Sequence, residues 1–237
     1  QFLLDQGFDG LVVLGGNGSF QGARMLANGS KLQVVGIPCT IDNDIVGTEY
    51  CIGFDTARNT AIKAIDNIRD TAFSHDRNFI IEVMGKCSGF LAVNVGISVG
   101  AELIIIPESP LSIEQICKKV TNKHREKMTS IIVAAEADNP GHSFQLAKDI
   151  KQHCHSEYKV CVLGHIQRGG SPTAKDRIMG TLMGAKAVTA LLDGKTNIMM
   201  AMQQDQVITS EFPGPDDATH FFDRKDMLTI NEIVCRI

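Results

Sequence analysis

Residues 10–19 read Gly-Leu-Val-Val-Leu-Gly-Gly-Asn-Gly-Ser, a short apolar run followed at once by a glycine-rich turn. Continuous apolar runs of this length predict strands that are covered on both faces. Further runs of this kind are residues 33–37, 78–84, 103–107, 130–135, 160–163 and 198–202. Helix-length segments between them include 55–73, 113–123, 144–153 and 176–192. The alternation predicts an α/β fold with a mostly parallel sheet, in which ligands collect at loops after the carboxyl ends of strands.

The composition excludes several classes of protein. The chain has 237 residues, of which 43% are hydrophobic and 21% charged, as in ordinary soluble globular proteins. A net charge of −4 argues against a general nucleic-acid binder, which needs a basic face. The seven cysteines form no CxxC pair, which favours reduced thiols in the cytoplasm over a disulfide framework or a zinc site. No apolar run approaches the roughly 20 residues that cross a bilayer.

The first candidate loop is the glycine-rich turn from Gly15 to Gly22. Glycines allow backbone N–H groups to approach a phosphate, and the start of a helix adds its dipole. The spacing matches neither GxGxxG nor a Walker A loop, so a plain turn is the alternative. The later sequence Gly194-Lys195-Thr196 resembles a Walker A ending, but a helix stop is the simpler interpretation of this glycine.

The second candidate loop, residues 38–44, also follows a predicted strand and carries Asp42 and Asp44. Two carboxylates at the carboxyl end of a strand can divide their roles. One can accept a hydroxyl proton, while the other faces a cation or a sugar hydroxyl. An Asx-turn that leads into the next segment is the alternative.

Three further loops carry charge. Residues 84–89 place Lys86 in a glycine turn, and Glu136 ends a buried strand. For each of these, a solvated surface position is the alternative. In residues 164–172, His165 and Arg168 lie among glycines, and with Lys159 they predict a compact anion site, because so many donors are costly to hold together without an anion.

Taken in this order, the loops resemble those of the phosphofructokinase family. Residues 15–19 are similar to its GGDGS loop, residues 40–44 to its TIDND loop, and residues 84–86 lie where it has MGR. Residues 159–177 fit its long signature, a basic residue followed by Gly-His-x-Gln-Arg-Gly-Gly and then Asp-Arg. The resemblance implies two Rossmann-like three-layer α/β/α domains with mostly parallel sheets that face each other across a cleft. It assigns 1–54 and 167–217 to a nucleotide-binding domain, and 55–166 and 218–237 to a sugar-phosphate-binding domain.

The resemblance implies transfer of the γ-phosphoryl group of ATP to the 1-hydroxyl of fructose 6-phosphate, with Mg²⁺, at the committed step of glycolysis. The catalytic residues would be Asp42 as the base, Thr40 beside the transferring phosphoryl group, and Lys86 touching it. ATP would be bound by Gly16, Asn17, Gly18, Ser19 and Gly22, and the metal by Asn17 and Asp44. The substrate-binding residues would be Thr40, Asp42, Asp44, Arg77, Met84, Gly85, Lys86, Glu136, Lys159, His165 and Arg168.

The resemblance also implies an assembly. In the family, the residues at positions 77 and 159 reach a neighbouring subunit's substrate site, so a homo-oligomer, a tetramer in bacteria, is expected. Glu102, Arg125 and Lys127 fall where bacterial relatives bind effectors between subunits, and a surface charge cluster is the alternative there.

The sequence departs from the family pattern at charged positions. Asn17 replaces an aspartate, so we expect weaker metal binding, because an amide supplies an oxygen ligand without charge. Lys86 and Lys159 replace arginines and keep the charge without the bidentate fork. These departures support a second hypothesis, in which the chain is a weakened or incomplete subunit that binds sugar phosphate.

Two positions bear on the phosphoryl donor. Pyrophosphate-dependent relatives have an aspartate at position 18 and a lysine at position 39. Gly18 leaves room for a nucleotide and favours ATP, whereas Cys39 is typical of neither group. The family's first strand and glycine turn, which complete its ATP pocket, have no counterpart in residues 1–237. For a chain that starts at Gln1, we therefore expect poor folding or no kinase activity.

Overall fold

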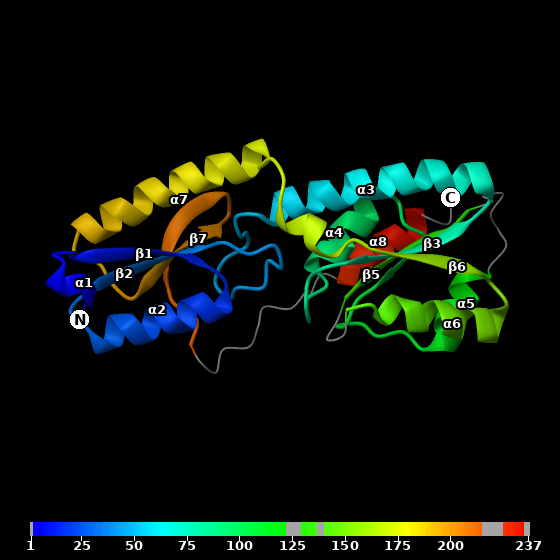
Figure 1. Cartoon of the computed structure of the whole chain (residues 1–237), viewed down its shortest axis with the longest axis horizontal. Helices are drawn as coiled ribbons and strands as arrows, with labels where there is room; N and C mark the ends of the chain where they lie inside the picture. The colour runs from blue at the N-terminus through cyan, green and yellow to red at the C-terminus, as the bar shows by residue number, and fades with distance from the viewer. Residues whose placement is uncertain (1, 122–128, 137–139, 215–224, 235–237) are drawn as a thin grey trace. The chain divides into compact units, whose positions relative to one another are not determined.

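The computed structural model describes residues 2–121, 129–136, 140–214 and 225–234. The chain folds into two compact units, one formed by Gln1–Asp55 and Ser171–His220, the other by Thr56–Gly170 and Phe221–Ile237. Each unit contains a four-stranded sheet with helices on both of its faces (Figure 1). The predicted α/β class with mostly parallel sheets is confirmed.

The first unit begins with a short helix and then alternates strand and helix. Its elements are α1 (Phe2–Asp5), β1 (Gly10–Gly15), α2 (Asn17–Gly29), β2 (Gln33–Pro38), α7 (Ala174–Leu192), β7 (Ile198–Gln203) and β8 (Gln206–Glu211). The sheet order is β1-β2-β7-β8, with β1, β2 and β7 parallel and β8 antiparallel to β7. Because the first three strands run the same way, the loops that follow them lie at one edge of the sheet.

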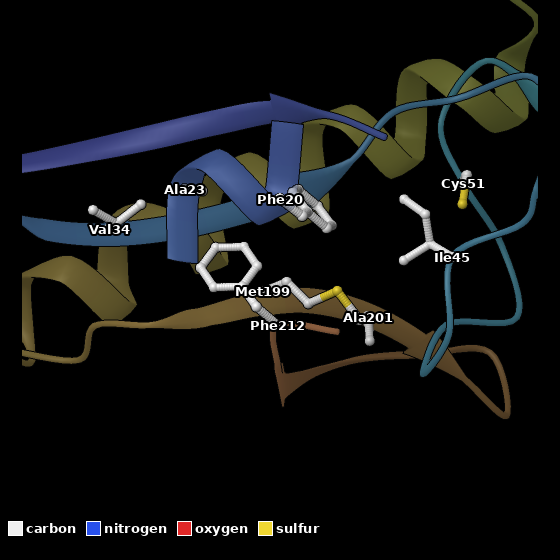
Figure 2. Packing of buried hydrophobic residues seen from close by; sticks show 8 residues of the cluster. All are labelled: Phe20, Ala23, Val34, Ile45, Cys51, Met199, Ala201 and Phe212. Atoms are coloured by element: carbon white, nitrogen blue, oxygen red, sulfur yellow. The ribbon is translucent and has the colours of Figure 1, made fainter. Parts of the chain in front are cut away.

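Helices α2 and α7 cover opposite faces of this sheet (Figure 1). The core between α2 and the strands contains Phe20 and Phe212, whose ring centroids are 5.1 Å apart in an edge-to-face arrangement (Figure 2). Gly36 in β2 lies directly against these rings. A Cβ atom there would approach Phe212 Cε1 to 2.4 Å and Phe20 Cε1 to 2.9 Å, so any larger residue at this position would have to displace one of the two rings.

Strand β8 was not predicted. It pairs with β7 in a hairpin whose two turn residues, Gln204 and Asp205, both have positive φ. Such turns usually carry Asn-Gly or Asp-Gly, which is the signal that sequence analysis looks for. Gln-Asp lacks that signal, so the alternating apolar and polar residues of β8 did not stand out as a strand.

The second unit has an entirely parallel sheet in the order β4-β5-β3-β6. Its elements are β3 (Asn78–Val83), α4 (Phe90–Ser98), β4 (Leu103–Ile105), α5 (Ile113–Val120), β5 (Ile131–Ala135), α6 (His142–Cys154), β6 (Tyr158–Val162), the 3₁₀ helix η1 (Gly164–Arg168) and α8 (Lys225–Val234). Helix α3 (Phe54–His75) begins at the end of the first unit's segment and continues in the second. Ile65 is the fully buried isoleucine on its apolar side, and Ile62 and Ile68 are partly buried.

Local sequence signals explain one end of α5 and one end of α7. Helix α5 starts with a capping box, in which Ser112 accepts from Gln115 N and the Gln115 side chain accepts from Ser112 N. Helix α7 ends at Leu192, and Gly194 follows with φ 74°, as expected of a helix stop. The phosphate-loop interpretation of residues 194–196 therefore has no support.

We predict that Gly36→Ala destabilises the protein by about 1–3 kcal/mol, because the new methyl group overpacks the Phe20–Phe212 contact. Gly180→Ala in α7 is the matched control. A Cβ atom at Gly180 meets no atom within 4 Å, so this variant should gain about 0.5–1 kcal/mol from lower backbone freedom in the unfolded chain. Urea unfolding measures both, and equal stability of the two variants would contradict the packing argument.

Candidate active site

The glycine-rich turn lies between β1 and α2. Gly16 is the N-cap of α2, and no side chain caps this helix end. A Cβ atom on Gly15 would lie 2.4 Å from Ser19 Oγ, so the first glycine is required by the close turn itself. In contrast, Cβ atoms at Gly18 and Gly22 would meet nothing within 4 Å. The start of α2 thus combines uncapped backbone N–H groups with open space, which suits a phosphate group.

Residues 40–51, which we call the acidic loop, follow β2, the neighbour of β1. Thr40 Oγ1 accepts a hydrogen bond from Asp42 N at 3.2 Å. Asn17 Nδ2 donates to Asp44 Oδ2 at 3.0 Å, which joins the start of α2 to the acidic loop. Asp42 and Asp44 are 3% and 7% exposed, so both carboxyl groups lie below the surface rather than on a solvated turn. The structure therefore brings Gly16, Asn17, Thr40 and the two aspartates together.

The far side of the acidic loop is held by the β7–β8 hairpin. Glu49 N donates to Met202 O at 2.8 Å, and Met202 N donates to Thr48 Oγ1 at 2.9 Å. Gln203 Nε2 donates to Gly47 O at 3.1 Å. These contacts were not predicted, because they join residues about 155 positions apart.

A buried network adjoins this loop at the start of α7. The Asp176 carboxylate accepts from Gly53 N at 2.9 Å and from the Tyr50 hydroxyl at 3.1 Å. Burial raises the pKa of the Tyr50 phenol far above its ordinary value, and Asp176 adds to the effect, so this group stays a hydrogen-bond donor. Burial, together with Asp176, also raises the pKa of the Cys39 thiol to about 11, so Cys39 is no nucleophile at neutral pH.

The donor set of Asn17 and Asp44 fits Mg²⁺ that arrives with a nucleotide. Both side chains offer hard oxygen atoms, which Mg²⁺ prefers. Over the residues that the structure describes, no three His, Cys, Asp or Glu side chains gather into a group that could hold a metal ion. A cation here would thus need phosphate oxygens and water for its other ligands, as Mg²⁺ in phosphoryl-transfer sites does.

In the second unit, three loops lie at the carboxyl edge of the parallel sheet. The first begins at Met84 after β3 and needs glycine at position 85, where φ is 144° and a Cβ atom would lie 2.6 Å from Ser88 O. Lys86 N donates to Glu136 Oε1 at 3.1 Å, which joins this turn to the end of β5. Lys86 is exposed, whereas Met84 and Glu136 are buried.

The second loop begins at Glu136 after β5, and the third follows β6 and forms η1. Gln167 is buried, and its Nε2 donates to Gly164 O at 3.1 Å, which closes the turn. His165 and Arg168 flank it and are exposed. Their loop lies beside the first because β6 pairs with β3, and Leu163 N donates to Glu82 O. The edge therefore presents a lysine, a histidine and an arginine together with the Glu136 carboxylate.

Arg77 and Lys159 lie at the opposite, amino end of the same sheet. Arg77 precedes β3, and Lys159 is paired in register with Phe79. Lys159 Nζ lies 3.1 Å from Glu157 Oε1 and lowers the pKa of that carboxyl, with help from Lys151 and Arg77. At about 3.3 Å per residue, β6 keeps Lys159 well away from His165 and Arg168. The structure does not gather these residues into the one predicted anion site.

The predicted effector residues are only partly described. Glu102 Oε2 accepts from Ile131 N at 2.8 Å at the start of β5. Arg125 and Lys127 lie outside the described residues. None of the described helices is both long and apolar enough to span a lipid bilayer.

Comparison with known proteins assigns the family. The sequence profile described as Phosphofructokinase matches residues 1–191. The ATP-dependent 6-phosphofructokinase of Coxiella burnetii is 56% identical over 235 residues, which are 99% of this chain and 72% of that protein. ATP-dependent 6-phosphofructokinase 1 of Thermus thermophilus is 50% identical over 85% of this chain and 63% of its own length.

Solved structures agree in fold. Phosphofructokinase from Saccharomyces cerevisiae superposes with a TM-score of 0.79 at 32% identity, over 88% of this chain and 32% of that one. The pyrophosphate-dependent enzyme from Marinobacter aquaeolei gives 0.82 at 23% identity, over 97% and 69%, and shows the fold alone. With the profile match over residues 1–191 and the identity to the bacterial sequences, the chain belongs to the phosphofructokinase family.

Proposed function

We propose that this protein transfers the γ-phosphoryl group of ATP to the 1-hydroxyl of fructose 6-phosphate, giving ADP and fructose 1,6-bisphosphate, the committed step of glycolysis. The 56% identity to an ATP-dependent 6-phosphofructokinase supports it. The structural observation that carries it is the bond from Asn17 Nδ2 to Asp44 Oδ2, because it joins a helix start suited to phosphate with a loop of two buried carboxylates.

In this reaction the 1-hydroxyl oxygen attacks the γ-phosphorus, the bond to ADP breaks, and the hydroxyl proton passes to the Asp42 carboxylate. Thr40 lies beside the transferring group, and Gly16, Asn17, Gly18, Ser19 and Gly22 bind the nucleotide. Mg²⁺ bound with ATP through Asn17 and Asp44 would neutralise charge on the phosphate oxygens. Phosphoryl transfer depends mainly on alignment and charge neutralisation, which these residue types supply.

The second unit would bind the sugar phosphate. We assign Met84, Gly85 and Glu136 to the sugar and His165 and Arg168 to its 6-phosphate. The hydrogen bond from Lys86 N to Glu136 Oε1 supports a common role for these two loops, and we assign the Lys86 ammonium to the transferring phosphate. An exposed histidine and arginine on one short helix supply donors suited to a phosphate dianion.

Arg77 and Lys159 have a different role in this proposal. They lie at the other end of the sheet from His165 and Arg168, next to Glu157. We infer that they complete a neighbouring subunit's substrate site in a cytoplasmic homotetramer. Glu102, with Arg125 and Lys127, would contribute to an effector site between subunits.

Pyrophosphate as the donor is the second candidate. The open space at Gly18 argues against it, because a nucleotide needs that room, while Cys39 does not discriminate. A weakened subunit that binds sugar phosphate is the third, supported by Asn17 and Lys86 in place of the family's aspartate and arginine.

The proposed base is tested by Asp42→Asn in the full natural chain. We expect turnover to fall by about 10²–10⁴-fold, because the amide cannot accept the hydroxyl proton. A coupled assay with ATP or pyrophosphate measures it, and a thermal shift with fructose 6-phosphate should show that sugar binding is retained. Unchanged turnover would contradict the assignment, and turnover of the wild type with pyrophosphate alone would favour the second candidate.

The donor preference is tested by Gly18→Asp. We expect about a tenfold higher KM for ATP and an unchanged KM for fructose 6-phosphate, because the carboxylate enters the space proposed for the nucleotide. Gly29→Asp adds the same charge at the other end of α2, where a Cβ atom also meets nothing within 4 Å, and serves as the control. Equal effects of the two variants would argue against a nucleotide at Gly18.

The metal role is tested by Asn17→Asp. In the absence of Mg²⁺ the variant loses the bond from Asn17 Nδ2 to Asp44 Oδ2 and places a second carboxylate beside that of Asp44, which should destabilise the protein by about 1–3 kcal/mol. Mg²⁺ with ATP should restore the melting temperature and show tighter binding than to the wild type in calorimetry. Asp44 would not be a metal ligand if Mg²⁺ left the variant's melting temperature unchanged.

A further inference from the structure

Asn43 lies between the two aspartates of the acidic loop, and its side chain is used entirely within that loop. Its Oδ1 accepts a hydrogen bond from Cys51 N at 2.7 Å, and its Nδ2 donates to Glu49 O at 3.1 Å. The residue is 4% exposed. Both ends of the amide are therefore engaged with backbone groups six and eight residues further along the chain. We call this pair of hydrogen bonds the Asn43 clip.

The backbone at Asn43 is also unusual. Its φ is 53°, in the left-handed region, which asparagine tolerates better than most residues other than glycine. This conformation turns the chain sharply between Asp42 and Asp44. Fixing residue 43 consequently fixes the backbone from which both carboxylates project.

The partners of the clip are themselves anchored to regular structure. Glu49 N donates to Met202 O in β7, so the carbonyl that Asn43 binds belongs to a residue held by the sheet. Cys51 follows Tyr50, whose hydroxyl donates to Asp176 at the start of α7. Cys51 itself is fully buried in the core of the first unit (Figure 2). The clip thus ties the acidic loop to the sheet on one side and to α7 on the other.

We propose that Asn43 is a positioning residue for phosphoryl transfer, which holds Asp42 and Asp44 in place through its clip to Glu49 O and Cys51 N. The inference rests on the proposed function. Misplacing a reacting group by about 1 Å can cost about 10²-fold in rate. Without the clip, the turn between Asp42 and Asp44 loses both hydrogen bonds of the Asn43 side chain. The residues proposed to grip the sugar ring and its 6-phosphate are in the other unit, and the acidic loop meets only the reacting 1-hydroxyl, so sugar affinity should depend little on the clip.

Asn43→Gly is the main test, because glycine keeps the left-handed backbone and removes only the side chain. We expect kcat to fall by about 10²-fold, with the KM for fructose 6-phosphate unchanged within about twofold. Gln203→Ala is the matched control. This variant removes the hydrogen bond from Gln203 Nε2 to Gly47 O, which also holds the acidic loop but at a point away from the aspartates. It should leave kcat and the KM for fructose 6-phosphate unchanged. Equal losses of kcat in the two variants, or none in Asn43→Gly, would overturn the positioning role.

Hydrogen exchange at the Cys51 amide provides a readout that does not need activity. We expect slow exchange in the wild type and at least about tenfold faster exchange in Asn43→Gly, while Gln203→Ala exchanges like the wild type. If the glycine variant does not fold, Asn43→Asp replaces it. That variant keeps the acceptor for Cys51 N and loses the donor to Glu49 O, so it should keep the protection at Cys51 while kcat falls.

The two proposals fail in different ways. Fast exchange at Cys51 in the wild type overturns the clip and leaves the proposed function standing. Slow exchange at Cys51 in a wild-type protein that phosphorylates no sugar overturns the proposed function, and the catalytic role of Asn43 with it.

Discussion

A buried carboxylate must be matched by hydrogen-bond donors, and this requirement places the loops at the edge of each sheet. For four buried carboxylates the donors are loop or helix-end groups. Asp44 accepts from Asn17, Asp176 from Gly53 N and Tyr50, Glu136 from Lys86 N, and Glu82 from Gly141 N and Ser143 N. Glu82 is 1% exposed within β3 and meets the start of α6, where a negative charge is favourable. Each carboxylate thereby fixes a loop or helix end that the sheet alone would leave free.

The elements of the fold could be predicted from the sequence because each depends on local pattern. The apolar runs at 11–14 and 130–135 predict β1 and β5 to within one residue at each end. The loops that carry chemistry could also be located, since parallel strands send their ligands to one edge. Strand β8 was not predicted, because its turn has Gln204 and Asp205 at positions where glycine or asparagine is usual.

The pairing of loops could not be predicted from local pattern. The contact between Asn17 and Asp44 depends on β1 and β2 being neighbours in register, which periodicity does not reveal. Lys159 was grouped with His165 and Arg168 because they are close in sequence, yet a strand lies between them. Asn43 gave one usable signal, an asparagine inside a turn, where left-handed backbone is common.

The environment of Cys39 has a consequence for the chemical durability of the site. Its thiol lies directly before the acidic loop, and with a pKa of about 11 only about one molecule in 10⁴ carries a thiolate at neutral pH. Oxidants and alkylating reagents attack the thiolate, so the residue next to Thr40 is shielded from them by protonation. The same burial and the same Asp176 carboxylate that help to hold the acidic loop thus keep the Cys39 thiol protonated.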